Sequence, residues 1–340
     1  MKKFYKILFL SILIISTLIS ISSYSWMAMW MGLEINVLSI IPILNSEKNK
    51  LSSESSIKYF ITQTIASSMI ILSIIIMMMN SSFSSKMNQE SLMIFIMNSS
   101  LLMKMGMTPF HFWFPEVLEG LDWMNCMLML TWQKIAPMVL LMLNIKFKSF
   151  MMITILMAMI VSGLMAFNQV SMRKILAYSS INHMGWMIAA MIYLQTTWMM
   201  YFLIYSILTI NVILIMNKNK IYFINQLIQK LNFYPMIKIM FIINFLSLAG
   251  IPPFLGFLPK WLTIQTMINK SLIVLPVMMI IFTMMMIYVY INISLSTYMI
   301  KSNSMNWIIN SKSKMNYMTM MINSILLTSL MIATLTFNLY

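Results

Sequence analysis

Long apolar runs separated by short polar connections recur along almost the whole chain. A helix of about 20 apolar residues spans the roughly 30 Å of hydrocarbon in a bilayer. Eleven segments have this length and composition: 4–23, 25–44, 57–79, 91–107, 122–143, 149–168, 172–194, 196–216, 236–268 as a broken pair, 272–297 and 317–337. The pattern predicts an all-α polytopic membrane protein with about eleven transmembrane helices.

The composition agrees with that pattern. The chain is 61% hydrophobic and only 9% charged, and its mean hydropathy is +0.87, far from the values of soluble domains. The first segment follows Lys2 and Lys3, which is also typical of a signal peptide. Its apolar run is too long for that, and no small-x-small cleavage site precedes the next segment. We therefore expect it to be the first transmembrane helix.

Basic residues are distributed unevenly between the two sides of the predicted membrane. The formal charge of +15 would suggest a nucleic-acid partner in a soluble protein, but the positive-inside rule explains this charge better. No nucleic-acid partner is expected. Loops on the N-terminal side hold fifteen basic residues: Lys2, Lys3, Lys6, Lys48, Lys50, Lys58, Arg173, Lys174, Lys218, Lys220, Lys230, Lys238, Lys301, Lys312 and Lys314. Loops on the opposite side hold four: Lys86, Lys146, Lys148 and Lys270. The N-terminus should therefore face the matrix or cytoplasm and the C-terminus the other side. The remaining three lysines lie inside predicted membrane segments.

The sequence contains no motif typical of the active sites or cofactor sites of soluble enzymes. Cys126 is the one cysteine, which excludes a disulfide framework, a four-cysteine cluster and a structural zinc site. There is no dinucleotide-binding or phosphate-binding glycine motif and no Ser/His/Asp set. We expect a chain that moves charge, without a redox centre, metal or bound cofactor of its own.

The amino-acid composition indicates which kind of genome encodes the chain. The chain has 46 methionines and a single arginine. An A/T-rich genome gives this composition when ATA is read as methionine, as in animal mitochondria. A flexible, methionine-filled apolar interior would have the same composition, and both explanations can hold.

Two membrane segments are interrupted by the same motif. The frame G-x-x-P-F-x-x-x-x-P occurs at 106–115 and returns at 250–259. The interrupted segments are the fourth and the ninth, so they cross the membrane in opposite directions. This predicts two inverted five-helix repeats with an ion pathway between them. The expected divisions are a first half at 1–143 with its break near 104–115, a second half at 144–298 with its break near 250–260, and a loop with an extra helix at 299–340.

Glu34 and Lys104 are the first candidate pair. Glu34 is the only acidic residue deep in a segment, and an ionised carboxylate there needs a partner or a proton. Lys104, just before the first break, is the expected partner. A charge at this depth is unfavourable by about 3 kcal/mol on insertion scales. The alternative is that the long side chain of Lys104 reaches the membrane surface.

Lys134 is the second candidate. It is the thirteenth of the twenty-two residues in segment 122–143, and Pro137 removes a backbone hydrogen bond nearby. Desolvation disfavours a charged lysine and a neighbouring carboxylate favours it. Lys134 can therefore act as a switchable proton carrier, or else as part of a purely structural ion pair.

Two further candidates lie in the second half. Lys260 follows the second break and precedes Trp261, so it is either a functional cation or an interfacial anchor. His183 lies near the centre of the seventh segment, the repeat counterpart of the segment that holds Glu34. Histidine, with an unperturbed pKa of about 6.5, can take up and release protons. A hydrogen-bonding contact between helices is the other interpretation.

Several stretches together resemble a known family. They are WMGLEIN (30–36), KYFITQ (58–63), LLMKMGMTPFHFWFPEVLEGLDW (101–123), TWQKIAP (131–137), RKILAYSSINHMGW (173–186) and FLSLAGIPPFLGFLPKW (245–261). In this order they resemble the antiporter-like subunits of mitochondrial NADH:ubiquinone oxidoreductase, respiratory complex I, in an insect-like form. The resemblance covers residues 1 to about 300.

The resemblance implies a function. Such a chain is a proton-pumping subunit of an H+-translocating NADH:ubiquinone reductase, with Glu34, Lys104, Lys134 and Lys260 at the family's charged positions. It implies neighbouring antiporter-like chains and membrane lipids as partners, and NAD, FMN, iron–sulfur clusters and ubiquinone in partner subunits. It also implies the mitochondrial inner membrane, with the N-terminus in the matrix and the C-terminus in the intermembrane space. The alternatives are a stand-alone cation/proton antiporter and a passive scaffold.

Overall fold

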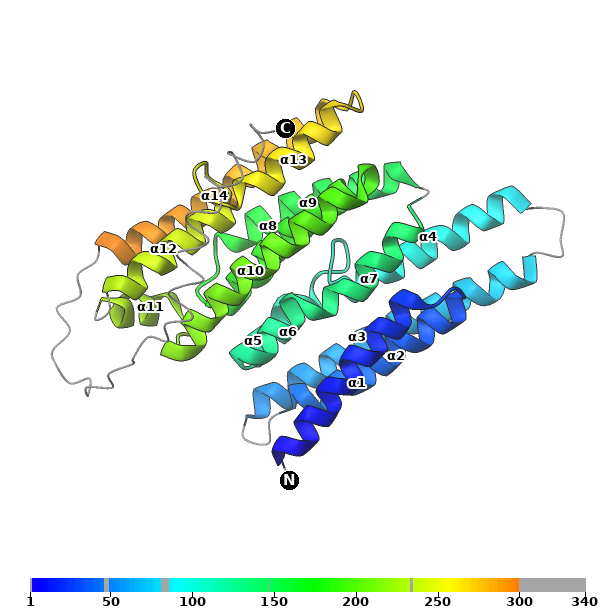
Figure 1. Ribbon diagram of the computed structural model, residues 1–340, viewed down its shortest axis with the longest axis horizontal. Coiled ribbons are helices and arrows are strands. Elements are labelled where there is room, and N and C mark those ends of the chain that lie inside the picture. The colour runs from blue at the N-terminus through cyan, green and yellow to red at the C-terminus, as the bar shows by residue number, and fades with distance from the viewer. Residues whose placement is uncertain (1, 46–48, 81–85, 146, 233–234, 300–340) are drawn as a thin grey trace, which may run out of the picture. The chain divides into compact units, whose positions relative to one another are not determined.

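The computed structural model describes residues 2–45, 49–80, 86–145, 147–232 and 235–299, and these are helical apart from their connections (Figure 1). One isolated bridge, between Ser171 and Phe223, is the only β pairing in this part of the chain. The predicted all-α class is confirmed for these residues. The chain forms two compact units, Met1–Ala158 and Met159–Tyr340, each of which is described by itself.

The first unit is made of seven helices and the first half of an eighth. They are α1 (Lys2–Ser22), α2 (Trp26–Leu44), α3 (Lys50–Asn80), α4 (Lys86–Met105), α5 (Trp113–Gly120), α6 (Trp123–Leu130), α7 (Trp132–Leu143) and α8 (Lys148–Ala166). α1 and α2 pack closely, because a Cβ on Gly32 would lie 2.8 Å from the backbone nitrogen of Ser20. Small residues allow helices to pack this closely in a membrane.

The first broken segment ends α4 at a glycine. Gly106 has a φ of +72°, its N–H donates to Met103 O at 3.1 Å, and Met107 N–H donates to Leu102 O at 3.0 Å. These two bonds form a Schellman motif, which satisfies carbonyls at a helix end and favours glycine because of the positive φ. The helix resumes as α5 at Trp113.

Segment 122–143, predicted as one helix, is interrupted. α6 ends at Leu130, Thr131 has φ −115° and ψ −71°, and α7 begins at Trp132. Pro137 lies within α7. Proline lacks an N–H and its ring crowds the carbonyl of the preceding turn, so sharp helix bends usually lie just before it. The sequence analysis noted Pro137 but did not predict the interruption.

The second unit contains the rest of α8 and six further helices. They are α9 (Met172–Tyr193), α10 (Gln195–Asn219), α11 (Ile224–Leu231), α12 (Pro235–Ala249), α13 (Phe257–Ile268) and α14 (Val274–Met299). α9 is buried over nearly its whole length and contacts α10, α13 and α14. It is the central helix of this unit.

The second broken segment repeats the hydrogen bonds of the first. Gly250 has a φ of +77°, its N–H donates to Ser247 O at 3.0 Å, and Ile251 N–H donates to Leu246 O at 3.4 Å. The chain resumes a helix at Phe257, the same number of residues after the glycine as Trp113 is after Gly106. The shared sequence frame therefore produces the same local backbone twice.

Helix α11 was not predicted. It has only eight residues, too few to span a bilayer, so a search for long apolar runs overlooks it. Leu227 and Leu231 are buried on one face, and Lys230 Nζ donates to Asn219 O and Lys220 O at 2.8 and 2.9 Å. Lys230 thus caps the C-terminus of α10, where helix carbonyls lack intrahelical partners.

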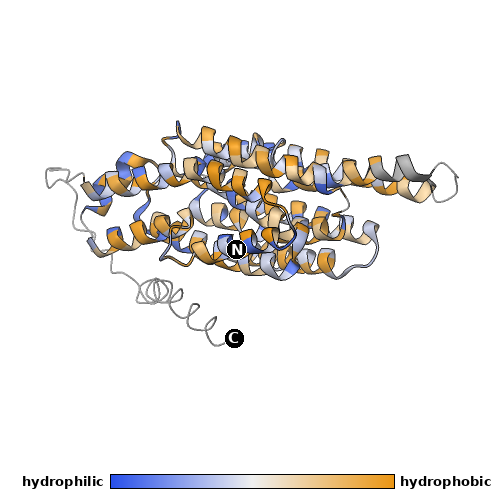
Figure 2. Cartoon of the chain, turned by 90° about the horizontal axis from the view of Figure 1, so that it is seen from above, coloured by the Kyte–Doolittle hydropathy of each residue, from blue (hydrophilic) through white to orange (hydrophobic). Residues whose placement is uncertain are grey.

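Within the described residues, eight helices are long and apolar enough to cross a membrane, and two shorter apolar helices lie at Leu92–Met105 and Pro235–Ala249. Figure 2 shows apolar residues along nearly the whole length of the helices. Large apolar side chains such as Ile15 and Leu18 are exposed, as expected for surfaces that face lipid or partner chains. The predicted eleventh segment, 317–337, lies outside the described residues.

Candidate functional site

Lys104 is buried in the last turn of α4, two residues before Gly106. Its side chain is only 6% exposed, and its Nζ has no hydrogen-bond partner within the described residues. The Gln63 side chain on α3 donates to the Lys104 carbonyl at 3.3 Å, which fixes the end of α4. The lysine is held inside the protein rather than extended to the surface.

Glu34 on α2 interacts electrostatically with Lys104. Its Oε2 is buried and, like Lys104 Nζ, lacks a hydrogen-bond partner in the described part of the chain. The two charges therefore attract each other over more than hydrogen-bond distance. A small movement of either group would change that attraction, because the energy varies inversely with distance.

Lys134 is almost completely buried on α7, at 1% exposure. Its Nζ lies 5.3 Å from the centre of the Phe114 ring, within the range of a cation–π interaction. Phe114 on α5 also covers Gly106, because a Cβ on that glycine would lie 2.8 Å from Phe114 Cβ. One aromatic ring thus packs against the first helix break and the central lysine.

A row of neutral polar groups connects the helices that carry Glu34 and Lys134. Gln133 Nε2 donates to Asn36 Oδ1 at 2.8 Å, and Tyr59 Oη donates to Gln133 Oε1 at 3.5 Å. Asn36 is two residues from Glu34, and Gln133 precedes Lys134. The sequence analysis did not single out these residues. The only signal for them in the sequence was that they lie within the WMGLEIN, KYFITQ and TWQKIAP stretches.

Lys260 lies at the second break, at 9% exposure. Its Nζ donates to the carbonyl of Ala249, the last residue of α12, at 2.6 Å. The side chain folds back over Gly250, where an added Cβ would lie 2.8 Å from Nζ. The partial negative charge at a helix C-terminus stabilises a cation there. The neighbouring Trp261 is 44% exposed, whereas Lys260 is buried.

His183 lies on α9 in the second unit, buried at 7% exposure. Its Nδ1 shares a hydrogen bond of 3.0 Å with Tyr201 Oη, and the tautomer decides which group donates. The Tyr205 ring centre is 5.1 Å from the imidazole centre. His183 is therefore surrounded by α10 tyrosines that the sequence analysis did not single out, although their spacing of four residues places them on one helix face.

The five candidate residues fall into two groups. The first unit brings together Glu34, Lys104 and Lys134, and the second unit contains His183 and Lys260. No group of three His, Cys, Asp or Glu side chains that could hold a metal occurs among the described residues. Both groups are suited to moving protons, since they consist of ionisable side chains held in low-dielectric surroundings.

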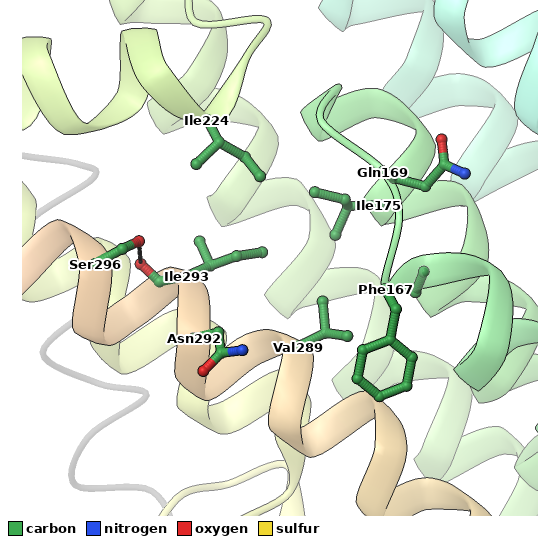
Figure 3. A pocket seen from close by; sticks show the side chains of 9 residues that line it. Phe167, Gln169, Ile175, Ile224, Val289, Asn292, Ile293 and Ser296 are labelled. Carbon is green, nitrogen blue, oxygen red and sulfur yellow. Dashed lines mark hydrogen bonds between the residues drawn. The ribbon is translucent and has the colours of Figure 1, made fainter.

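A separate cavity of about 240 Å³ lies in the second unit (Figure 3). Side chains from α9, α11 and α14, among them Ile175, Ile224 and Val289, form its apolar walls. The polar residues that line it are Gln169, Asn292 and Ser296. None of the residues that line it is titratable, so the cavity is not a proton-binding site.

Comparison with known proteins identifies the family. Residues 23–286 match the family described as NADH:quinone oxidoreductase/Mrp antiporter, transmembrane. The chain belongs to this family. It is 43% identical to NADH-ubiquinone oxidoreductase chain 2 of Anopheles gambiae over 96% of both chains, and 44% identical to that of Locusta migratoria over 98% of this chain and 96% of the relative.

A solved structure has the same fold. The chain superposes on a chain of respiratory complex I from Thermus thermophilus with a TM-score of 0.84, over 98% of this chain and 79% of that one, at 20% identity. The resemblance to the antiporter-like family that the sequence motifs indicated is confirmed. It extends over nearly the whole sequence.

Proposed function

We propose that this chain is the antiporter-like, proton-translocating chain 2 subunit of a mitochondrial NADH:ubiquinone oxidoreductase. Near-full-length similarity to relatives of that name supports the assignment. The observation that carries the proton-pumping role is a set of buried lysines, with Lys104 interacting electrostatically with Glu34. Buried charges are costly in a membrane protein and mark ion pathways.

The first unit supplies the switch. When the separation of Glu34 and Lys104 changes, the electrostatic potential at Lys134 changes with it. At a distance of about 5 Å and an effective dielectric constant of about 20, a unit charge contributes about 3 kcal/mol, roughly a hundredfold in proton affinity. A change of that size is enough to load and unload Lys134. Phe114 helps to hold the charged form of Lys134 through its ring face.

The second unit receives the proton. His183 and Lys260 are buried ionisable groups on α9 and α13, two helices in contact. Lys260 can give up its proton and keep its hydrogen bond, since the neutral amine still donates to Ala249 O. Both residues are therefore the acceptors that we propose for the proton released by Lys134.

The chain contains two inverted repeats of five membrane-crossing segments each, with an eleventh segment after them. The matching Schellman bonds at Gly106 and Gly250 support this, as does the equal spacing to the resumed helices. The repeats comprise residues 1–143 and 144–298, with 299–340 as an extension. Inverted repeats with broken helices are a common basis of transporters.

The chain carries out no redox step. NADH oxidation and ubiquinone reduction take place in partner subunits that hold NAD, FMN, iron–sulfur clusters and ubiquinone. The one cysteine here, Cys126, is buried and bonds to backbone carbonyls, and a cluster needs several such ligands. The assembly lies in the mitochondrial inner membrane with this N-terminus in the matrix and the C-terminus in the intermembrane space.

Replacing Lys134 by Met tests the function. In the purified complex reconstituted into liposomes, Lys134→Met should abolish the proton uptake assigned to this chain while the complex still assembles, because methionine fills a similar volume without a titratable group. The measurement is protons taken up per NADH oxidised. The exposed Lys148→Met on α8 is the matched control and should behave like the unmodified complex. An unchanged proton-to-electron ratio in Lys134→Met refutes the proposed function.

A further inference from the structure

Two tyrosine side chains lie against His183 in the interior of the second unit, and a third interacts with both of them. Tyr201 and Tyr205 come from α10 and Tyr290 from α14, and each is at most 2% exposed. Each of the two α10 tyrosines has its ring within 6.0 Å of the His183 ring, measured between centres. Tyr290 interacts electrostatically with both Tyr201 and Tyr205. Three buried tyrosines from two helices, α10 and α14, therefore form one cluster with His183.

The hydroxyls are not equivalent. Tyr201 Oη is hydrogen-bonded to His183 Nδ1 at 3.0 Å. Tyr205 interacts with the Ser180 side chain, one turn before His183 on α9. Tyr290 lies near Ser179, but its Oη makes no hydrogen bond with any described residue.

The serines next to this cluster are oriented as acceptors. Ser179 Oγ donates to Leu176 O at 2.8 Å and Ser180 Oγ donates to Ala177 O at 2.7 Å, both within α9. Their protons are thus committed to the helix backbone, and the oxygen lone pairs remain for the tyrosine hydroxyls. This gives the cluster a defined direction, from tyrosine donors to serine acceptors.

Helix packing alone does not account for the arrangement. Burying a hydroxyl without a partner is unfavourable by about 1–3 kcal/mol, whereas phenylalanine would fill the same space without that cost. Tyr290 is buried and its oxygen has no hydrogen-bond partner among the described residues, although it interacts with Tyr201 and Tyr205, the two tyrosines that lie against His183. Such a group is expected where protons or water pass.

We propose that Tyr201 is the positioning residue of His183, and that the hydroxyls of Tyr205 and Tyr290 continue a row of buried hydroxyls from Tyr201 to α14. Tyr201 determines which imidazole nitrogen carries the proton. When His183 passes a proton to Tyr201 Oη, the O–H bond that forms is balanced by the one that breaks as Tyr201 releases its own proton to the next oxygen. The inference rests on the proposed function, because it concerns how protons cross the second unit.

Tyr201→Phe tests the positioning role. The variant keeps the ring and removes one hydroxyl, so coupled NADH oxidation in liposomes should slow about fivefold to tenfold, the effect of losing one hydrogen bond. The solvent deuterium isotope effect should rise, because proton transfer becomes limiting. Tyr288→Phe is the matched control, since Tyr288 is on α14 but 55% exposed, and it should change neither quantity. An unchanged rate, or a slower rate with an unchanged isotope effect, overturns the proposal.

A double variant shows whether Tyr201 acts through His183. His183→Leu should slow coupled turnover, and adding Tyr201→Phe should cause no further loss, because both changes remove one interaction. Independent losses that multiply would refute the positioning role.

Tyr290→Phe avoids the risk that a variant does not fold. It removes a hydroxyl that has no hydrogen bond within the described residues, so the complex should assemble normally, with coupled turnover about twofold slower and a raised isotope effect. A normal rate excludes Tyr290 from the route. If Lys134→Met abolishes pumping while the tyrosine variants behave normally, this inference fails and the proposed function stands. If Lys134→Met pumps normally, the proposed function fails.

Discussion

The two helix breaks share a backbone but place their cations differently. At Gly106 the space over the glycine is filled by Phe114, and the cation, Lys104, precedes the break. At Gly250 the same space is filled by Lys260, which follows the break and bonds to Ala249 O. The residue in the first break that corresponds to Lys260 is Glu116, which instead forms a surface ion pair with Lys58 at 3.0 Å.

This difference separates backbone architecture from chemistry. The repeated motif supplies a helix end at a glycine with a positive φ. The side chains then decide whether the cation is held by a distant carboxylate, as Lys104 is by Glu34, or by a helix carbonyl, as Lys260 is. The first arrangement responds to movement of a charge, while the second holds its cation in a fixed place.

The largest effect on stability is expected at a position that is tightly packed in one break and exposed in the other. A Cβ on Gly256 would overlap the carbonyl oxygen of Ser247, whereas the corresponding Phe112 in the first break is 69% exposed. Gly256→Ala should therefore destabilise the protein by about 3 kcal/mol or more, because backbone must move. Phe112→Ala should have little effect on stability. Thermal unfolding of the purified complex measures both, and equal melting temperatures would show that the second break is not tightly packed.

The two lysines at the breaks should differ in their contribution to stability. Lys104→Met and Lys260→Met should both reduce proton pumping. Lys104→Met alone leaves the Glu34 carboxylate without its charge partner, so stability is compared in the double variant Glu34→Gln with Lys104→Met, which removes both charges and should keep or raise stability. Lys260→Met leaves the Ala249 carbonyl unbonded, so it should be less stable than the double variant by about 2 kcal/mol. Proton uptake and thermal unfolding, measured side by side, test this. Loss of stability in the double variant would mean that the pair is structural.

The smallest effect is expected at the surface pair of the first break. Lys58 bonds to Glu54 and Glu116, both at 3.0 Å, but all three side chains are at least 43% exposed. Lys58→Met should lower the melting temperature slightly, and the difference should disappear in high salt because solvent ions screen exposed charges. Pumping should be unaffected. A salt-independent loss of activity would place this pair within the proton pathway.

Much of the fold followed from local sequence patterns. Segment 172–194 was predicted as a helix, and α9 covers Met172–Tyr193. Both breaks were predicted at their glycines, because glycine readily adopts the positive φ of a helix end and proline cannot continue a helix. The interruption at Thr131 and the short helix α11 were not predicted. The first depends on how one turn relaxes before Pro137, and the second is too short for a hydropathy search.

Only part of the candidate site could be predicted from the sequence. An ionisable residue inside an apolar run is visible in the sequence, which is why Glu34, Lys104, Lys134, His183 and Lys260 were proposed. Their partners were not visible. Phe114, Ala249 and Tyr201 are ordinary residues whose importance depends on which atoms they face.

The sequence by itself therefore determined which segments form long apolar helices, where the two glycine breaks lie and which side chains carry charge, since these depend on neighbours along the chain. Only the tertiary structure decided that Lys134 lies over a phenylalanine ring, that Lys260 caps a helix and that Tyr201 and Tyr205 lie against His183. Those contacts join residues from separate helices. No local pattern encodes them, because they arise from how the helices pack.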